Sequence, residues 1–144
     1  MPSYLIVGNQ TLMGPELKAA IAERIVPGDP PGVHVVVPAT PRPGAFTWNE
    51  DEATADAQGR LDAMLEHLKG LGLNATGEVG YRDPVEAARD ALRGHPADEI
   101  ILSTLPTGIS RWLGQDVPSR LKSAVSVPVV VVTAEHAPIE TKSG

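Results

Sequence analysis

The fold of this chain is decided by residues 98–132, which begin DEIILST (98–104) and end VPVVVV (127–132). The apolar, β-branched runs predict buried strands over 100–103 and 127–133. Between them, the run PSRL (118–121) opens a predicted short helix over 118–125, and a loop rich in Gly, Ser and Arg precedes it. Strand, helix and strand form a βαβ unit, and such units bind anionic ligands at the carboxyl end of the strand. The loop after residue 104 is therefore the first candidate for a functional site.

The rest of the chain alternates strand and helix in the same way. Short apolar runs predict strands over 4–7 and 34–37, and a weak alternation predicts a further strand over 74–79, at an edge of the sheet. Helical spacing predicts helices over 14–26, from a cap at Thr47 or Asn49 to Gly70 or Gly72, and over 84–93, where Asp83 and Pro84 are typical of a helix start. This alternation predicts an α/β three-layer sandwich, with a parallel sheet covered by helices on both faces.

Composition places the chain among ordinary globular proteins. Its 144 residues suit one domain, which we expect over 1–134, followed by a disordered tail over 135–144. The absence of cysteine excludes disulfides and cysteine-ligated metals, and we expect a cytoplasmic protein. A net charge of −6 and the lack of a long apolar run argue against nucleic-acid and membrane partners. Within this acidic chain, the segment 103–122 is locally basic, because its charged residues are Arg111, Arg120 and Lys122 and a single acid, Asp116. The candidate site loop lies in this segment.

Strands 4–7 and 100–103, if adjacent, would form a crevice at their carboxyl ends. Side chains there offer hydroxyl, amide and guanidinium groups that suit a phosphate or ribose. The alternative is structural: Gly108 shapes a turn, Ser110 caps a short segment, Arg111 is solvated, and Asn9 satisfies turn backbone. The candidate residues for a nucleotide or other anion are Gly8, Asn9, Gln10, Thr11, Thr104, Gly108, Ser110, Arg111, Gly114 and Gln115.

Three segments carry a resemblance to a known family: GYRDPVEAA (80–88), ADEIIL (97–102) and VPVVV (127–131). Over about residues 3–133 the chain resembles the universal stress protein family, within the adenine-nucleotide α-hydrolase-like fold. The resemblance implies a five-stranded sheet in the order 3-2-1-4-5, a homodimer formed through the last strand, and a stress-related role. For some members it also implies ATP binding.

The nucleotide-binding members have an acid just after the first strand and the pattern Gly-x2-Gly-x9-Gly-Ser/Thr after the fourth. Here the acid's position holds Asn9, and Ser103 stands where the first glycine is expected. Gly108 matches the second glycine loosely, and Gly114 matches the third but is followed by Gln115. Side chains at the glycine positions hinder close approach of phosphates to backbone N–H groups. The motif is degenerate, and the binding of ATP or another adenine nucleotide stays open.

Catalytic patterns are missing from the sequence. His34, His67, His95 and His136 are widely spaced and form no zinc motif, so we predict no metal site. The segment GISRW (108–112) lacks the closing glycine of a nucleophile elbow, and no P-loop pattern occurs. We expect a noncatalytic domain.

Two apolar features are interface candidates. Val129, Val130, Val131 and Val132 form a flat apolar run that would lie at a sheet edge, where antiparallel pairing with a second copy would cover it. Trp112 and Trp48 either pack loops onto the core or anchor an interface. Two functions follow: noncatalytic binding of an adenine nucleotide or other anion, or a non-nucleotide dimeric interaction module that uses the 38–48 loop and Trp112.

Overall fold

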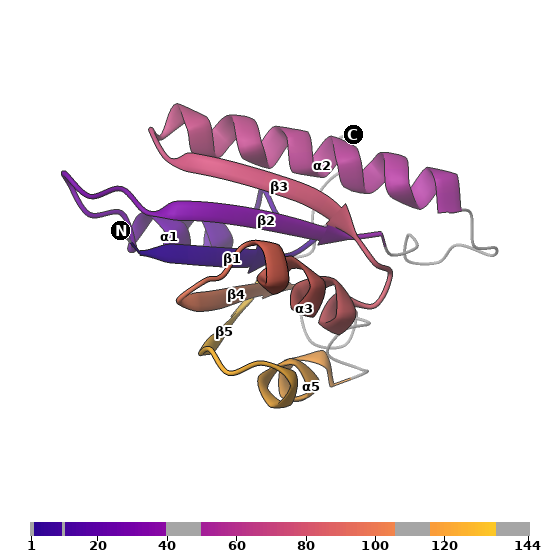
Figure 1. Ribbon diagram of the computed structural model, residues 1–144. Helices are drawn as coiled ribbons and strands as arrows, with labels where there is room; N and C mark the ends of the chain where they lie inside the picture. Colours follow the sequence, from indigo (N-terminus) through magenta and orange to yellow (C-terminus); the bar gives the residue numbers. More distant parts are fainter. Residues whose placement is uncertain (1, 10, 40–49, 106–115, 135–144) are drawn as a thin grey trace.

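Strands and helices alternate along the chain in the computed structural model, which describes residues 2–9, 11–39, 50–105 and 116–134 (Figure 1). The strands are β1 (Ser3–Val7), β2 (Gly32–Pro38), β3 (Asn74–Gly80), β4 (Glu99–Thr104) and β5 (Val129–Thr133). The helices are α1 (Pro15–Ala22), α2 (Glu50–Gly70), α3 (Pro84–Gly94) and α5 (Val117–Ala124). Each predicted strand and helix is present in this order, and the predicted α/β class is confirmed.

The strands form one parallel sheet in the order β3-β2-β1-β4-β5. This confirms the order that the family resemblance implied and places β3 at an edge, as its weak apolar pattern predicted. The central strand is β1, where Val7 is the register partner of Val36 on β2 and of Leu102 on β4. The carboxyl ends of β1 and β4 are therefore neighbours, which is the condition for the predicted crevice.

Side-chain alternation along the strands builds a core on each face of the sheet. One core joins Ile6, Val35 and Ile101 to apolar residues of α1 and α2, such as Leu17 and Leu61. The other core joins alternate positions on the same strands to α3 and α5; its members include Leu5, Val36, Ile100, Ala88 and Leu121. Figure 1 shows the two helix layers, with α3 and α5 on the opposite side of the sheet from α1.

Helix boundaries follow local chemistry, with one difference from the prediction. Helix α1 ends at Ala22 rather than at residue 26, because the N–H groups of Arg24 and Ile25 bond to carbonyls three residues back instead of four. Helix α5 begins at Val117, just after Asp116, but the Asp116 side chain makes no cap hydrogen bond. Asp116 has a φ of 57°, and its carbonyl accepts the Arg120 N–H at 3.1 Å.

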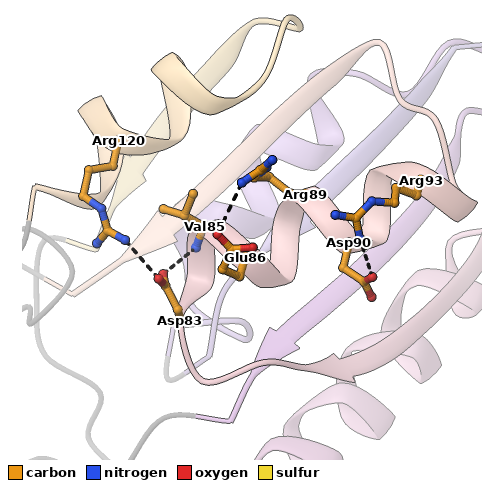
Figure 2. Close-up of polar contacts among 7 residues, drawn as sticks. All are labelled: Asp83, Val85, Glu86, Arg89, Asp90, Arg93 and Arg120. Atoms are coloured by element: carbon orange, nitrogen blue, oxygen red, sulfur yellow. Dashed lines mark hydrogen bonds and ion pairs between the residues drawn. The ribbon is translucent and has the colours of Figure 1, made fainter.

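Helix α3 begins as its sequence predicts. Asp83 is the N-cap, its Oδ1 accepts the Val85 N–H at 3.0 Å, and Pro84 occupies the first turn. Asp83 Oδ2 also pairs with the guanidinium of Arg120 on α5 at 3.0 Å (Figure 2). One carboxylate therefore starts α3 and ties it to α5.

Several predictions fall on residues outside the described part of the chain. These are the caps of α2 at Thr47 or Asn49, the 40–48 part of the Pro-rich loop and the tail over 135–144. Within the described residues, no helix combines the length and the apolar character needed to span a membrane.

Candidate functional site

Several polar residues lie at the carboxyl ends of β1 and β4, and three of them, Asn9, Thr11 and Thr104, are predicted site residues. Gly8, Asn9 and Thr11 follow β1, and Ser103 and Thr104 end β4. Their side chains are buried: Asn9 is 5% exposed, Thr11 4%, and Ser103 and Thr104 2% each. Burial of this many polar groups requires that they bond to one another or to backbone.

Gly8 allows the turn after β1 to pack closely against β4. A Cβ at this position would lie 3.0 Å from Leu12 Cδ2 and 3.3 Å from the Cβ of Ser103. Both approaches are tighter than ordinary van der Waals contact. Gly8 therefore has a packing role.

Asn9 links three elements through its side-chain amide. Its Nδ2 donates to the carbonyl of Pro38 at the end of β2, at 2.7 Å. Its Oδ1 accepts from a guanidinium nitrogen of Arg60 on α2, at 2.6 Å. The carbonyl that accepts this hydrogen bond from the Asn9 amide is thus on the neighbouring strand β2. Arg60 is brought to the end of β1 from 51 residues along the chain.

The hydroxyl groups divide between the two faces of the sheet. Thr11 Oγ1 and Ser103 Oγ share a buried hydrogen bond. Thr104 Oγ1 instead donates to Thr133 Oγ1 on β5 at 3.3 Å. Since successive residues of a strand point to opposite faces, Ser103 shares a face with Ile101, and Thr104 shares the other face with Leu102. Thr104 therefore does not join the group formed by Asn9, Thr11, Ser103 and Arg60, which we call the carboxyl-end cluster.

The other predicted site and loop-interface residues lie outside the described part of the chain. They are Gln10, Gly108, Ser110, Arg111, Gly114, Gln115, Trp112 and Trp48. Arg120, one of the three basic residues that made the segment 103–122 locally basic in sequence, is paired with Asp83. Val129, Val130, Val131 and Val132 all lie on β5, at the sheet edge where the sequence placed them.

The electrostatics of the carboxyl-end cluster depend on Arg60. Among residues 2–9, 11–39, 50–105 and 116–134, Arg60 bonds to the neutral Asn9 amide and forms no ion pair. A guanidinium carries five N–H donors in a planar fork that suits phosphate oxygens. The cluster therefore offers one positive charge, an amide and two hydroxyls. These groups can hold and orient an anion or a sugar.

A second polar group lies on the α3 face of the sheet. His34 on β2 places Nδ1 2.7 Å from Thr76 Oγ1 and Nε2 2.7 Å from Glu78 Oε2, both on β3. The ring of His95, just after α3, stacks on the His34 ring with centroids 3.6 Å apart and planes within 9° of parallel. Burial lowers the pKa of His34 below its usual value, against the opposing effect of its hydrogen bond to Glu78.

Sequence reasoning missed both Arg60 and the group around His34. Arg60 occupies an ordinary polar position of α2, and His34, Glu78 and His95 lie on three separate elements. No spacing motif joins these residues, because their contacts arise only when the elements pack. The burial of His34 within an apolar strand was the one local signal that its ring needs polar partners.

Comparisons with known proteins identify the fold. A universal stress protein from Archaeoglobus fulgidus is 17% identical, with a TM-score of 0.61 over 92% of this chain and 93% of that one. A protein from the universal stress protein family from Burkholderia pseudomallei is also 17% identical, with a TM-score of 0.61 over 90% of this chain and 94% of that one. The universal stress protein from Archaeoglobus fulgidus in complex with dAMP is 17% identical, with a TM-score of 0.55 over 92% of this chain and 97% of that one.

The sequence matches no protein-family model, and it gives no significant match to a curated protein. The likeness to the solved structures nevertheless extends over nearly the whole chain. It shows that this chain has the fold of the universal stress proteins.

Proposed function

We propose that this chain, which has the universal stress protein fold, is a noncatalytic domain that binds an adenine nucleotide or another small anion at the carboxyl-end cluster. The observation that carries the proposal is the position of Arg60. Helix α2 delivers this cation to the end of the central strand, where it meets a neutral amide instead of a carboxylate. The stress-related role that the family resemblance implied and the cytoplasmic location expected from the absence of cysteine belong to the same proposal.

The sheet topology supports a ligand at this place. In open α/β sheets, ligands bind outside the carboxyl ends of the strands, where the strand order reverses. Here the reversal lies between β1 and β4, beside Asn9 and Ser103. A structure with the same fold has been solved in complex with dAMP, which carries the adenine and phosphate chemistry proposed here.

This chain has Asn9 at the position where the nucleotide-binding members of the family have an acid, and this difference changes the charge of the group that the cluster attracts. An acid at this position would lie within ion-pair distance of Arg60, since Asn9 Oδ1 is 2.6 Å from the guanidinium. The amide accepts one N–H bond but carries no charge, so within the part of the chain that the structure describes Arg60 has no carboxylate paired with it. In a chain with a net charge of −6, a partly buried cation of this kind favours an anionic group such as a phosphate.

The proposal is tested by the thermal midpoint of the purified protein with ATP, ADP, AMP, dAMP and inorganic phosphate, each with and without Mg²⁺. A ligand at 100 times its Kd stabilises the folded state by about 2.7 kcal/mol, which raises the midpoint by several degrees. We expect such a shift for the adenine nucleotides in the wild type. We expect Arg60→Gln to lose the shift.

Arg93→Gln is the matched control for Arg60→Gln, because Arg93 is exposed on α3, where it pairs with Asp90. Its nucleotide-dependent shift should equal that of the wild type. An unchanged shift in Arg60→Gln would place the ligand elsewhere on the molecule. If none of these ligands moves the midpoint, the nucleotide proposal is wrong, and the interaction module built on the 38–48 loop and Trp112 takes its place.

The edge strand β5 supports a second part of the proposal, which is a homodimer. Val129, Val130, Val131 and Val132 are only partly buried, although they form an unbroken apolar run. An edge of this kind presents unpaired backbone groups that another strand can join. We propose that two copies pair their β5 strands antiparallel around a two-fold axis, which is the usual symmetry of homodimers.

A further inference from the structure

The group around His34 lies apart from the carboxyl-end cluster and has the composition of a metal-binding site. His34, Glu78 and His95 can each offer one ligand atom, and these three atoms lie within 4.8 Å of one another. Ligand atoms on one tetrahedral ion, bound at about 2.0–2.2 Å, lie about 3.3 Å apart. In the structure, His34 Nε2 and Glu78 Oε2 are 2.7 Å apart, and no two of the three ligand atoms are more than 4.8 Å apart.

His34 is held in place as a ligand requires. The residue is 7% exposed, and its register partner on β3 is Thr76, whose hydroxyl lies 2.7 Å from Nδ1. Histidines that bind metals commonly have their second ring nitrogen fixed by a hydrogen bond of this kind. Thr76 thus serves as the outer partner that orients the ring.

The two hydrogen bonds of His34 allow the proton to move when a metal binds. Without a metal, Nε2–H donates to the carboxylate of Glu78, because two acceptors would repel each other at 2.7 Å, and Nδ1 accepts from the Thr76 hydroxyl. With a metal on Nε2, the proton resides on Nδ1 and donates to Thr76 Oγ1 instead. The Thr76 hydroxyl then accepts a hydrogen bond from His34 instead of donating one, so the buried His34 ring keeps a partner at each nitrogen.

His95 completes the set after a rotation of its ring. It is stacked on His34, and a metal lies in the plane of an imidazole that binds it, so both rings cannot bind one ion while parallel. His95 is exposed and follows the last residue of α3, where its backbone N–H bonds to the carbonyl of Ala91 at 2.9 Å. The backbone is therefore fixed, while the ring has solvent into which it can turn.

We propose that His34, Glu78 and His95 bind one divalent transition-metal ion, with Zn²⁺ as the expected occupant and water completing its coordination. Two imidazole nitrogens and one carboxylate oxygen suit Zn²⁺, whereas Mg²⁺ and Ca²⁺ prefer an all-oxygen set. The ion would join β2, the edge strand β3 and the end of α3. Since the ligands are distant in the sequence, it binds the folded chain and stabilises it.

Calorimetric titration of the tag-free, EDTA-treated protein with Zn²⁺ tests this site, with Mg²⁺ as the comparison ion. We expect one Zn²⁺ per chain, a rise of several degrees in the thermal midpoint, and no response to Mg²⁺. His95→Asn and Glu78→Gln alter exposed or half-exposed groups and should each weaken Zn²⁺ binding at least tenfold. Thr76→Val should weaken it by about tenfold through the loss of the outer hydrogen bond.

His67→Asn is the matched control, because His67 lies near the end of α2, outside the group. Its Zn²⁺ affinity should equal that of the wild type, and Zn²⁺ should shift the ring NMR signals of His34 and His95 but not those of His67. The proposal is overturned if the wild type binds no Zn²⁺ at millimolar concentration. It is also overturned if His67→Asn weakens binding as much as His95→Asn does, since binding would then be adventitious.

Discussion

Gly77 shows how a single missing Cβ sets the distance between a helix and the sheet. A Cβ at this position would collide with Leu61 of α2 and lie 2.9 Å from the carbonyl oxygen of Val35. The backbone oxygen is held in the sheet and has no room to move. Helix α2 therefore packs against β3 only because residue 77 has no side chain.

We predict that Gly77→Ala lowers the free energy of unfolding by about 1–3 kcal/mol through overpacking. Gly59→Ala is the matched change, because Gly59 lies inside α2 with nothing within 4 Å of an added Cβ. It should raise that free energy by about 0.5–1 kcal/mol, as alanine favours the helix. Urea unfolding measures both variants, and a Gly77→Ala protein as stable as the wild type would contradict the packing argument.

Some residues of the candidate site could be predicted from the sequence, and others could not. Asn9 and Thr11 follow an apolar run directly, so their place at the end of a strand could be predicted from local pattern. Arg60 could not be placed, because its contact with Asn9 depends on how α2 lies across the sheet. His34 and His95 form their stack for the same reason, through the packing of α3 on β2.

At the scale of elements, Asp83 combines two roles that mutation can separate. Its Oδ1 caps α3 and its Oδ2 pairs with Arg120 of α5, with about two-fifths of each side chain exposed (Figure 2). Exposed ion pairs contribute little, whereas an N-cap hydrogen bond contributes about 1 kcal/mol. The cap should therefore dominate the stability that Asp83 provides.

We predict that Asp83→Ala lowers the free energy of unfolding by about 0.5–2 kcal/mol, whereas Asp83→Asn, which keeps a good capping group, retains most of it. Asp90→Ala is the control, since Asp90 pairs with Arg93 on the exposed side of α3 and should cost less than about 0.5 kcal/mol. Thermal or urea unfolding gives the three values. Equal losses in Asp83→Ala and Asp83→Asn would assign the effect to the ion pair.

The elements themselves were largely predictable because their signals are local. Asp83 and Pro84 located the start of α3, and the valine run located β5. The end of α1 was predicted too late, since Ile25 continues the apolar spacing while the backbone has already tightened into a turn. The side chain of Asp116 forms no cap because its left-handed backbone conformation differs from the extended one of a capping residue.

For the whole molecule, the order of the strands was beyond the reach of local pattern. No local pattern in residues 4–7 or 100–103 indicates that these two strands are neighbours in the sheet. The order 3-2-1-4-5 came from the family resemblance. Parallel pairing of such distant segments is decided by the helices that must cover both faces. The α/β class was therefore predictable from the sequence pattern, and the strand order was predictable from the family resemblance.

We predict that the protein is a dimer at micromolar concentration and that Val130→Lys makes it monomeric. Val130 belongs to neither core group, so a lysine there charges the edge of β5 without removing a core side chain. Ser126→Lys, in the exposed segment before β5, is the control with the same added charge and should stay dimeric. Sedimentation equilibrium gives the mass, and a monomeric wild type would contradict the proposed pairing.

The central position of β1 also has a consequence during synthesis. Its amino end bonds to the segment that leads into β4, where Ser3 and Asp98 are 95 residues apart. At about 5–20 residues per second, the ribosome takes roughly 5–20 s to add that length. A nascent chain can assemble β1, β2 and β3 in this interval, while the other edge of β1 waits for β4. Chaperones that recognise apolar strands therefore have their longest access to this protein at the edge of β1 that later pairs with β4.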